Sequence, residues 1–170
     1  MSFLDLAAKR YSCKKYADTP VEQDKLEQVL EAARLAPTAK NAQPQHIYVL
    51  QSAEALAKMD GLTPCRYGAP VALLVTYNKD LTFRYPGGAY ESGAEDMGIV
   101  GAHLALAAAD AGLDTCWINN FDPDAAHEVF GLPANETAVL LMDLGYAAEG
   151  VKPLPNHAKR KPLDETVSYL

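Results

Sequence analysis

The run Pro70-Val71-Ala72-Leu73-Leu74-Val75-Thr76-Tyr77 decides the fold class of this 170-residue chain. Its apolar residues are continuous, a pattern that is typical of a β-strand covered on both faces. Such a strand needs helices on each side of the sheet that contains it. The run therefore predicts a sheet with a helical layer on both of its faces.

Helical segments of suitable length flank this run on both sides. Leu26, Val29, Leu30 and Ala33 recur at three- and four-residue spacing, which is typical of a helix with one buried face. The longest pattern is rich in alanine and carries Gly98, Gly101 and Ala105 at positions where another backbone could approach closely. The expected helices cover residues 2–9, 23–35, 52–59 with Ser52 as cap, 95–111 and 123–130.

Three further segments have the composition of strands: residues 46–51, 115–118 and 138–144. Residues 80–91 read as a loop around Pro86-Gly87-Gly88, and residues 163–170 are too apolar for a free tail, so we expect them to pair with another subunit. Because no linker interrupts residues 1–170, we expect one domain. The order of elements predicts a three-layer α/β or α+β fold.

The charge is distributed unevenly along the chain. The net charge is -7 and the isoelectric point is about 5.0, values that argue against a nucleic-acid-binding protein. Nevertheless eight of the 15 basic residues lie near the two ends. If the ends meet in the fold, an anion such as a phosphate group would compensate them. The eight residues are Lys9, Arg10, Lys14, Lys15, Lys152, Lys159, Arg160 and Lys161.

Several classes of protein are disfavoured by the sequence. No apolar run reaches the roughly 18 to 20 residues that span a bilayer, and the N-terminus lacks the features of a signal peptide, so we expect a cytoplasmic protein without a membrane partner. Three widely spaced cysteines and four scattered histidines predict neither disulfides nor a metal site. No GxGxxG motif follows the first strand, which disfavours a dinucleotide-binding Rossmann domain.

Five short motifs, in the same order and register, resemble the nitroreductase family of FMN-dependent oxidoreductases. They are Arg10-x-Ser12-x-Lys14, the loop Ala36-Pro37-Thr38-x-x-Asn41-x-Gln43-Pro44, Gly112-Leu113-x-x-Cys116-Trp117, Leu144-Gly145-Tyr146 and Lys159-Arg160-Lys161-Pro162-Leu163. The resemblance implies an α+β fold with a central, mainly antiparallel sheet between helical layers. It also implies an intertwined homodimer that holds FMN at the subunit interface.

The resemblance assigns cofactor-binding roles along the chain. Arg10 and Ser12 would bind the FMN phosphate and ribityl chain together with Arg160, since guanidinium groups and hydroxyls suit phosphate oxygens. Lys14 would lie by the N1 and O2 edge of the flavin, and the backbone at Asn119 and Asn120 beside N5, where many members carry an acidic residue and a glycine. The full expected set is Arg10, Tyr11, Ser12, Lys14, Ile118, Asn119, Asn120, Lys159 and Arg160 from one subunit, with Thr38, Asn41 and Gln43 from the other.

The chain lacks a long excursion that better-known members carry near the middle. Residues 81–90 are therefore the expected cover of the flavin face, and the aromatic and basic side chains there could orient an aromatic substrate. The candidate substrate residues are Phe83, Arg84, Tyr85 and Tyr90.

The expected function is that of an NAD(P)H-dependent FMN oxidoreductase. Hydride from NADH or NADPH would reach flavin N5, and a nitroaromatic, quinone or enone-like acceptor would then be reduced in a ping-pong cycle. Because the flavin carries the chemistry, no catalytic side chain is expected. The alternatives are a flavin-binding carrier or partner-binding dimer without turnover, and a dehalogenase or flavin-breakdown enzyme on the same scaffold.

Overall fold

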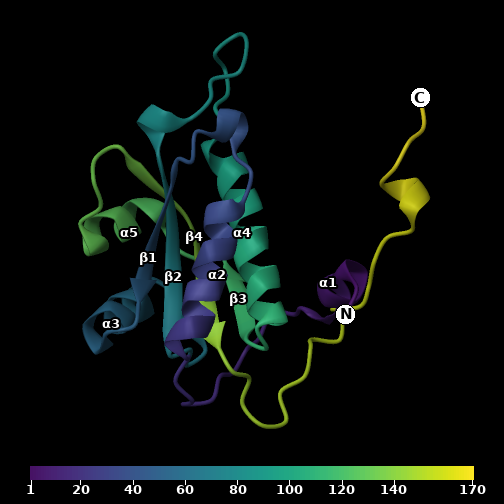
Figure 1. The fold of residues 1–170 in the computed structure, drawn as a ribbon. Coiled ribbons are helices and arrows are strands. Elements are labelled where there is room, and N and C mark those ends of the chain that lie inside the picture. Colours follow the sequence, from purple (N-terminus) through teal and green to yellow (C-terminus); the bar gives the residue numbers. More distant parts are fainter.

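A computed structural model describes residues 1–170 and has a four-stranded antiparallel sheet at its centre (Figure 1). The strand order is β1-β2-β4-β3. The strands are β1 Gln45–Leu50, β2 Val71–Asn78, β3 Asp114–Ile118 and β4 Glu136–Gly145. The predicted antiparallel α+β architecture is therefore confirmed.

Helices cover both faces of this sheet (Figure 1). Helices α2 (Gln23–Leu35) and α4 (Gly93–Asp110) pack on one face, where Leu73 and Val75 of β2 enter their hydrophobic cluster. Helices α3 (Ala53–Leu62) and α5 (Pro123–Phe130) pack on the other face against Ala72 and Leu74. Strand β2 is thus buried on both faces, as its composition predicts.

Element ends differ from the predicted ones where a local cap decides them. Helix α1 spans Phe3–Lys9, because Ser2 stands outside it as the N-cap and exchanges hydrogen bonds with Asp5. Helix α3 continues three residues beyond Met59 to Leu62, and Thr63 ends it before a proline. None of the helices combines the length and apolar character needed to cross a bilayer.

The two ends of the chain project from the sheet on the same side (Figure 1). The C-terminal segment contains only a short 3₁₀ helix at Leu163–Glu165 and forms no strand within this chain. Its apolar side chains are exposed, with 78% of Leu163 and 98% of Tyr169 accessible to solvent. The pairing of residues 163–170 with another subunit stays a prediction.

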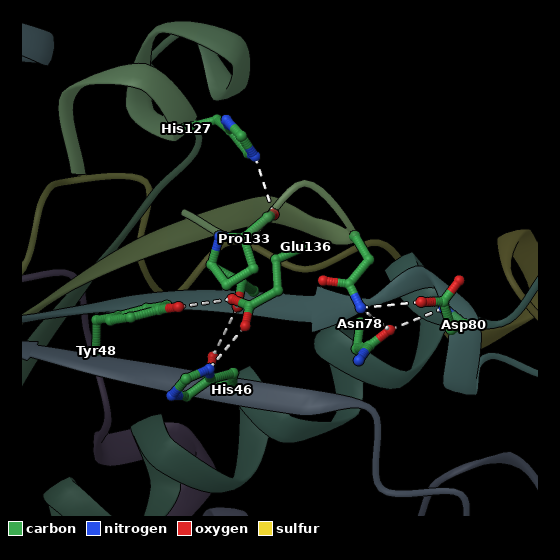
Figure 2. Close-up of polar contacts among 9 residues, drawn as sticks. His46, Tyr48, Asn78, Asp80, His127, Pro133 and Glu136 are labelled. Atoms are coloured by element: carbon green, nitrogen blue, oxygen red, sulfur yellow. Dashed lines mark hydrogen bonds and ion pairs between the residues drawn. The ribbon is translucent and has the colours of Figure 1, made fainter. Parts of the chain in front are cut away.

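Glu136 is a buried carboxylate with a full set of donors (Figure 2). Its Oε2 accepts hydrogen bonds from Thr76 Oγ1 at 2.7 Å and Tyr48 Oη at 2.9 Å, and its Oε1 accepts one from His46 Nδ1 at 2.8 Å. Burial alone would raise the pKa of Glu136, but these hydrogen bonds outweigh it and lower the pKa. The carboxylate therefore ties β4 to β1 and β2 at this end of the sheet.

Asp143, toward the other end of β4, is also buried but lacks hydrogen-bond donors. It lies between Ala72 of β2 and Cys116 of β3 in the ladder, is fully buried, and neither carboxyl oxygen has a hydrogen-bond partner. Burial raises its pKa to about 8, although the charges of Arg66 and Lys14 oppose the shift. Asp143 is therefore a neutral acid in the folded chain at pH 7.

Glycine permits the close approach of helix α4 to the sheet at two points, Gly93 against Tyr77 and Gly101 against Trp117. A Cβ added at Gly101 would overlap the ring of Trp117 and lie 3.0 Å from Leu140 Cδ2. The expected close-packing role is therefore confirmed for Gly101. For Gly98 it is wrong within this chain, because a Cβ there meets no atom within 4 Å.

We predict opposite effects on stability for these two glycines. Gly101→Ala should destabilise the fold by about 1–3 kcal/mol, because the Trp117 ring must move in a packed core. Gly98→Ala should be neutral or stabilising by about 0.5–1 kcal/mol, because alanine favours the helix. Urea unfolding of both variants and the wild type measures the difference, and equal effects would contradict the packing described.

A second prediction concerns the pH dependence of stability. The folded chain holds the Asp143 proton more tightly than the unfolded chain, so the free energy of unfolding should fall as pH rises from the ordinary pKa of 3.8 to about 8. At pH 7 the accumulated loss is on the order of 4 kcal/mol.

Asp143→Asn should remove this slope, because the amide is isosteric with the protonated acid and does not ionise. The measurement is urea unfolding at pH 5 and pH 8.5, with exposed Asp18→Asn as the matched control. Parallel pH profiles for wild type and Asp143→Asn would show that the carboxyl is not held neutral.

Candidate functional site

The two ends of the chain meet beside the edge strand β3. After α1 the chain runs along β3, where the Cys13 backbone N–H donates to the Thr115 carbonyl at 2.9 Å. From the C-terminal side, His157 Nε2 donates to the Ala8 carbonyl at 3.0 Å, and its ring meets the ring of Tyr11 edge-on at 6.3 Å. Residues nearly 150 positions apart therefore form one surface.

Two adjoining hollows occupy this surface. One of about 220 Å³ is lined by Ser12 and Lys14 from the N-terminal side and by residues of the C-terminal segment. The other, of about 190 Å³, lies between Arg10 and the C-terminal end of α4. Tyr11 borders both hollows, and burial raises the pKa of its hydroxyl, so it is neutral at pH 7. Asp114 also lines the smaller hollow, where its carboxylate accepts the Ala147 backbone N–H at 2.9 Å. The larger hollow contains no acidic residue in its lining, which suits an anion.

Lys14 is the cation at the inner end of the larger hollow. Its Nζ lies 3.2 Å from Tyr67 Oη and 3.2 Å from Cys116 Sγ, and 4.5 Å from the centre of the Tyr67 ring. Burial would lower the pKa of Lys14, but the hydrogen bonds to Cys116 and Tyr67 raise it above its usual value. Because no carboxylate lies within ion-pair distance, the ammonium is a charged donor without a formal counterion.

A thiol connects this lysine with the segment after β3. Asn120 Nδ2 donates to Cys65 Sγ at 3.6 Å, and Cys65 in turn is hydrogen-bonded to Tyr67. The hydrogen bonds from Tyr67 and Asn120 lower the pKa of the Cys65 thiol. The structure thus brings Lys14 and Asn120 together, as expected of residues that share one site.

The other residues expected after β3 have little side-chain freedom. The Ile118 side chain is buried in the core. Asn119 Oδ1 accepts from Trp117 Nε1 at 2.6 Å, and its Nδ2 donates to the Val139 carbonyl at 3.2 Å. Ile118 can therefore offer a ligand only its backbone, whereas the exposed Asn119 amide is held in place by these two hydrogen bonds.

Arg160 and Lys159, the expected basic residues of the C-terminal segment, do not line the hollow of Ser12 and Lys14. Arg160 borders a third hollow with Ala7, Ala8 and His157, and its guanidinium donates to the carbonyls of His157 and Lys159. Lys159 is exposed. Arg160 therefore lies beside α1 within reach of the surface that Tyr11 and His157 share.

The second expected group, Thr38 to Gln43, is a strained turn. Lys40, Asn41 and Gln43 have left-handed backbone angles, with φ of 53°, 54° and 50°. Thr38 Oγ1 accepts the Gln43 backbone N–H at 3.0 Å. Since a non-glycine residue in this region costs roughly 1 kcal/mol or more, the surrounding contacts must hold the turn. Such strain is frequent at ligand-binding loops.

Buried Asp96, near the start of α4, is hydrogen-bonded to this turn and also supports a hairpin formed by residues 83–92 just before the helix. Its Oδ1 accepts the Ala39 backbone N–H at 2.8 Å and its Oδ2 accepts from Ser92 Oγ at 2.7 Å. Ser92 Oγ in turn accepts the Phe83 backbone N–H at 3.1 Å. The hairpin carries the candidate substrate residues Phe83, Arg84, Tyr85 and Tyr90.

The two groups lie at opposite ends of α4 in one chain (Figure 1). The turn is fixed at the N-terminal end through Asp96, whereas the hollow beside Arg10 is lined by Ala109 at the C-terminal end. Asp96 and Ala109 are 13 residues apart on α4, a rise of about 20 Å at 1.5 Å per residue. Within one chain the two groups are therefore held well apart along the helix axis.

Sequence reasoning missed four residues of this region: Cys65, Tyr67, Asn156 and His157. Tyr67 reaches Lys14 and His157 reaches Tyr11 across more than 50 residues, so no local spacing indicates these contacts. Cys116 belongs to one of the quoted motifs, but its contact with Lys14 across 102 positions was not predicted.

Comparison with known proteins is consistent with this geometry. A nitroreductase family protein of Clostridium difficile 630 is 40% identical, with 99% of this chain and 98% of that chain covered and a TM-score of 0.93. A provisionally named NADH dehydrogenase/NAD(P)H nitroreductase of Archaeoglobus fulgidus is 29% identical over 81% of this chain and 80% of that protein. A protein of Exiguobacterium sibiricum, solved in complex with FMN, shares the fold with a TM-score of 0.82 at 21% identity, over 100% of this chain and 98% of that one.

The model of the Nitroreductase family matches residues 7–66 and 60–146, which include the Arg10-x-Ser12-x-Lys14 motif, the strained turn and the segment after β3. The match covers most of the chain, and a solved member shares 40% of its sequence over nearly the full length. The resemblance predicted from five short motifs is confirmed, and the chain belongs to the nitroreductase family.

Proposed function

We propose that this chain is an FMN-dependent oxidoreductase that oxidises NADH or NADPH and reduces a second small molecule. The observation that carries the proposal is the donor-rich surface where Arg10, Ser12 and Lys14 meet the C-terminal segment. Family membership supports it, as do the FMN complex of a protein with the same fold and the NAD(P)H nitroreductase names of relatives.

The residues present fit the parts of FMN. Arg10 and Arg160 are guanidinium groups near the shared surface, and Ser12 adds a hydroxyl, a donor set that suits a phosphate. Lys14 is a charged donor without a counterion and suits the edge of a flavin where negative charge accumulates. The turn carrying Thr38, Asn41 and Gln43 would supply amide groups to the ring.

Bound FMN supplies the two-electron redox chemistry, so the protein needs no catalytic acid or nucleophile of its own. The role of its side chains is to bind, orient and exclude water. Tyr67 and Cys116 hold the Lys14 ammonium in place, and Asn120 reaches the same network through Cys65. The backbone after β3 would contact the ring at its reactive edge.

The separation of the two candidate groups supports a homodimer. Since about 20 Å of α4 lies between Asp96 and Ala109, a flavin ring that contacts both groups is best placed between two chains. The exposed apolar side chains of α1 and of residues 163–170 offer surface for such a contact. We infer a single FMN-binding domain over residues 1–170, paired with a second copy in the cytoplasm.

The hairpin at the N-terminal end of α4 would cover the substrate side. Phe83 and Tyr85 pack against each other with ring centres 5.4 Å apart, and Tyr90 is exposed. Aromatic side chains of this kind can stack on a nitroaromatic, quinone or enone-like acceptor. Reductant and acceptor would use the same flavin face in turn, which is a ping-pong cycle.

The first test is the absorption of the FMN-loaded protein near 450 nm. Anaerobic addition of NADPH or NADH should bleach this band within the time of one catalytic cycle, and menadione should restore it. A band that persists with both reductants would instead indicate a flavin carrier without turnover. Release of a halide or of flavin fragments would indicate a different reaction on the same scaffold.

A second test addresses the phosphate contacts. The double variant Arg10→Ala/Arg160→Ala should bind FMN about 100-fold more weakly, since each charge-assisted hydrogen bond contributes about 1.5–3 kcal/mol. Fluorescence titration of the apoprotein measures the affinity. Arg34→Ala, which removes an exposed arginine paired with Glu31, is the matched control. Full-strength FMN binding by the double variant would exclude the assigned role.

A further inference from the structure

A larger hollow lies between the strained turn and the hairpin, away from the surface of Lys14. Its volume is about 560 Å³, within the range of small-molecule sites. Three basic side chains line it, Lys40 from the turn, Lys79 from the end of β2 and Arg84 from the hairpin.

These three cations have no counterions in the chain. No carboxylate lies within 4.0 Å of any of them, although the chain carries 22 acidic residues and a net charge of -7. The nearest acidic residue in the lining, Asp80, accepts a hydrogen bond from Asn135 at 2.9 Å (Figure 2). With Asp80 as the one acidic residue of the lining, the hollow keeps an excess of positive charge, which an anion between the three cations would offset.

The walls of the hollow are held in a fixed relation. Asp96 accepts from the Ala39 backbone on one side and, through Ser92, holds the Phe83 backbone on the other. The half-buried Phe83 ring lies 4.8 Å from Lys40 Nζ. The site therefore offers three exposed cations and one aromatic ring on a backbone that these hydrogen bonds hold in place.

We propose that this hollow binds the phosphate groups of the nicotinamide dinucleotide that reduces the flavin. Separate cations match a pyrophosphate, which carries its charge on two groups, better than they match a single carboxylate. The turn that contributes Lys40 also carries Thr38, Asn41 and Gln43, so phosphates held here would leave the nicotinamide end beside the flavin of the partner subunit. This inference rests on the proposed function, since it names the binding site of the reductant.

The test uses the double variant Lys40→Asn/Lys79→Gln of the FMN-loaded protein. Asparagine tolerates the left-handed backbone at position 40, so the turn is kept while the charge is removed. The KM for NADPH or NADH should rise about 10-fold, the loss expected for phosphate contacts of this kind. Lys58→Gln, on α3, is the matched control and should leave that KM unchanged.

Two further measurements separate this inference from the proposed function. The uncharged reductant N-benzyl-1,4-dihydronicotinamide lacks phosphates, so it should reduce wild type and double variant at equal rates. Isothermal titration of adenosine 5′-diphosphate into the oxidised protein, with no turnover, should show binding to wild type that the double variant loses. Bleaching of the wild type by NADPH with an unchanged KM in the double variant would overturn the phosphate site and leave the oxidoreductase proposal intact.

A selective effect on an anionic acceptor would also overturn the inference. If the double variant raised the KM of nitrobenzoate but not that of NADPH or NADH, the cations would bind the second substrate. Failure of every reductant to bleach the wild type would instead contradict the proposed function.

Discussion

The close contact between α4 and the sheet at Gly101 sets the positions of both candidate site regions. Because Gly101 carries no side chain, α4 lies directly against Trp117 and Leu140 of the sheet at this position. Its N-terminal end then holds the strained turn through Asp96, and its C-terminal end lines the hollow beside Arg10. One helix thus holds the two regions about 20 Å apart within a chain, and this separation is the physical reason to infer a second subunit.

Glu136 and Asp143 are both buried acids of β4, but their pKa values shift in opposite directions. Three side-chain donors keep Glu136 ionised and join three strands at one end of the sheet. Asp143 has no donor, and burial keeps it protonated, yet it lies close enough to Lys14 for their charges to interact. An ionised Asp143 would add a negative charge near that ammonium and weaken its attraction for an anion. A neutral Asp143 leaves the positive charge of Lys14 directed toward the hollow.

The fold was predictable from sequence wherever periodicity was strong. The apolar run ending at Tyr77 correctly indicated two helical layers, and the spacing of Leu26 and Val29 correctly indicated α2. The start of β4 was placed two residues late, because Glu136 looks like a surface residue until donors from β1 and β2 surround it. Motif residues Arg10 to Lys14 were found, whereas Tyr67 was not, since it lies in a loop without a repeating pattern and meets Lys14 across 53 positions.

The charges of this protein are arranged to select anions locally rather than globally. A net charge of -7 repels anions at long range, so an FMN or dinucleotide phosphate gains only at positions where cations lack partners. Two such positions exist, one where the chain ends meet and one between the strained turn and the hairpin. They lie at opposite ends of α4. In a dimer, the cations where the chain ends meet would hold the FMN phosphate, and those of the partner subunit's hollow would hold the phosphates of the dinucleotide.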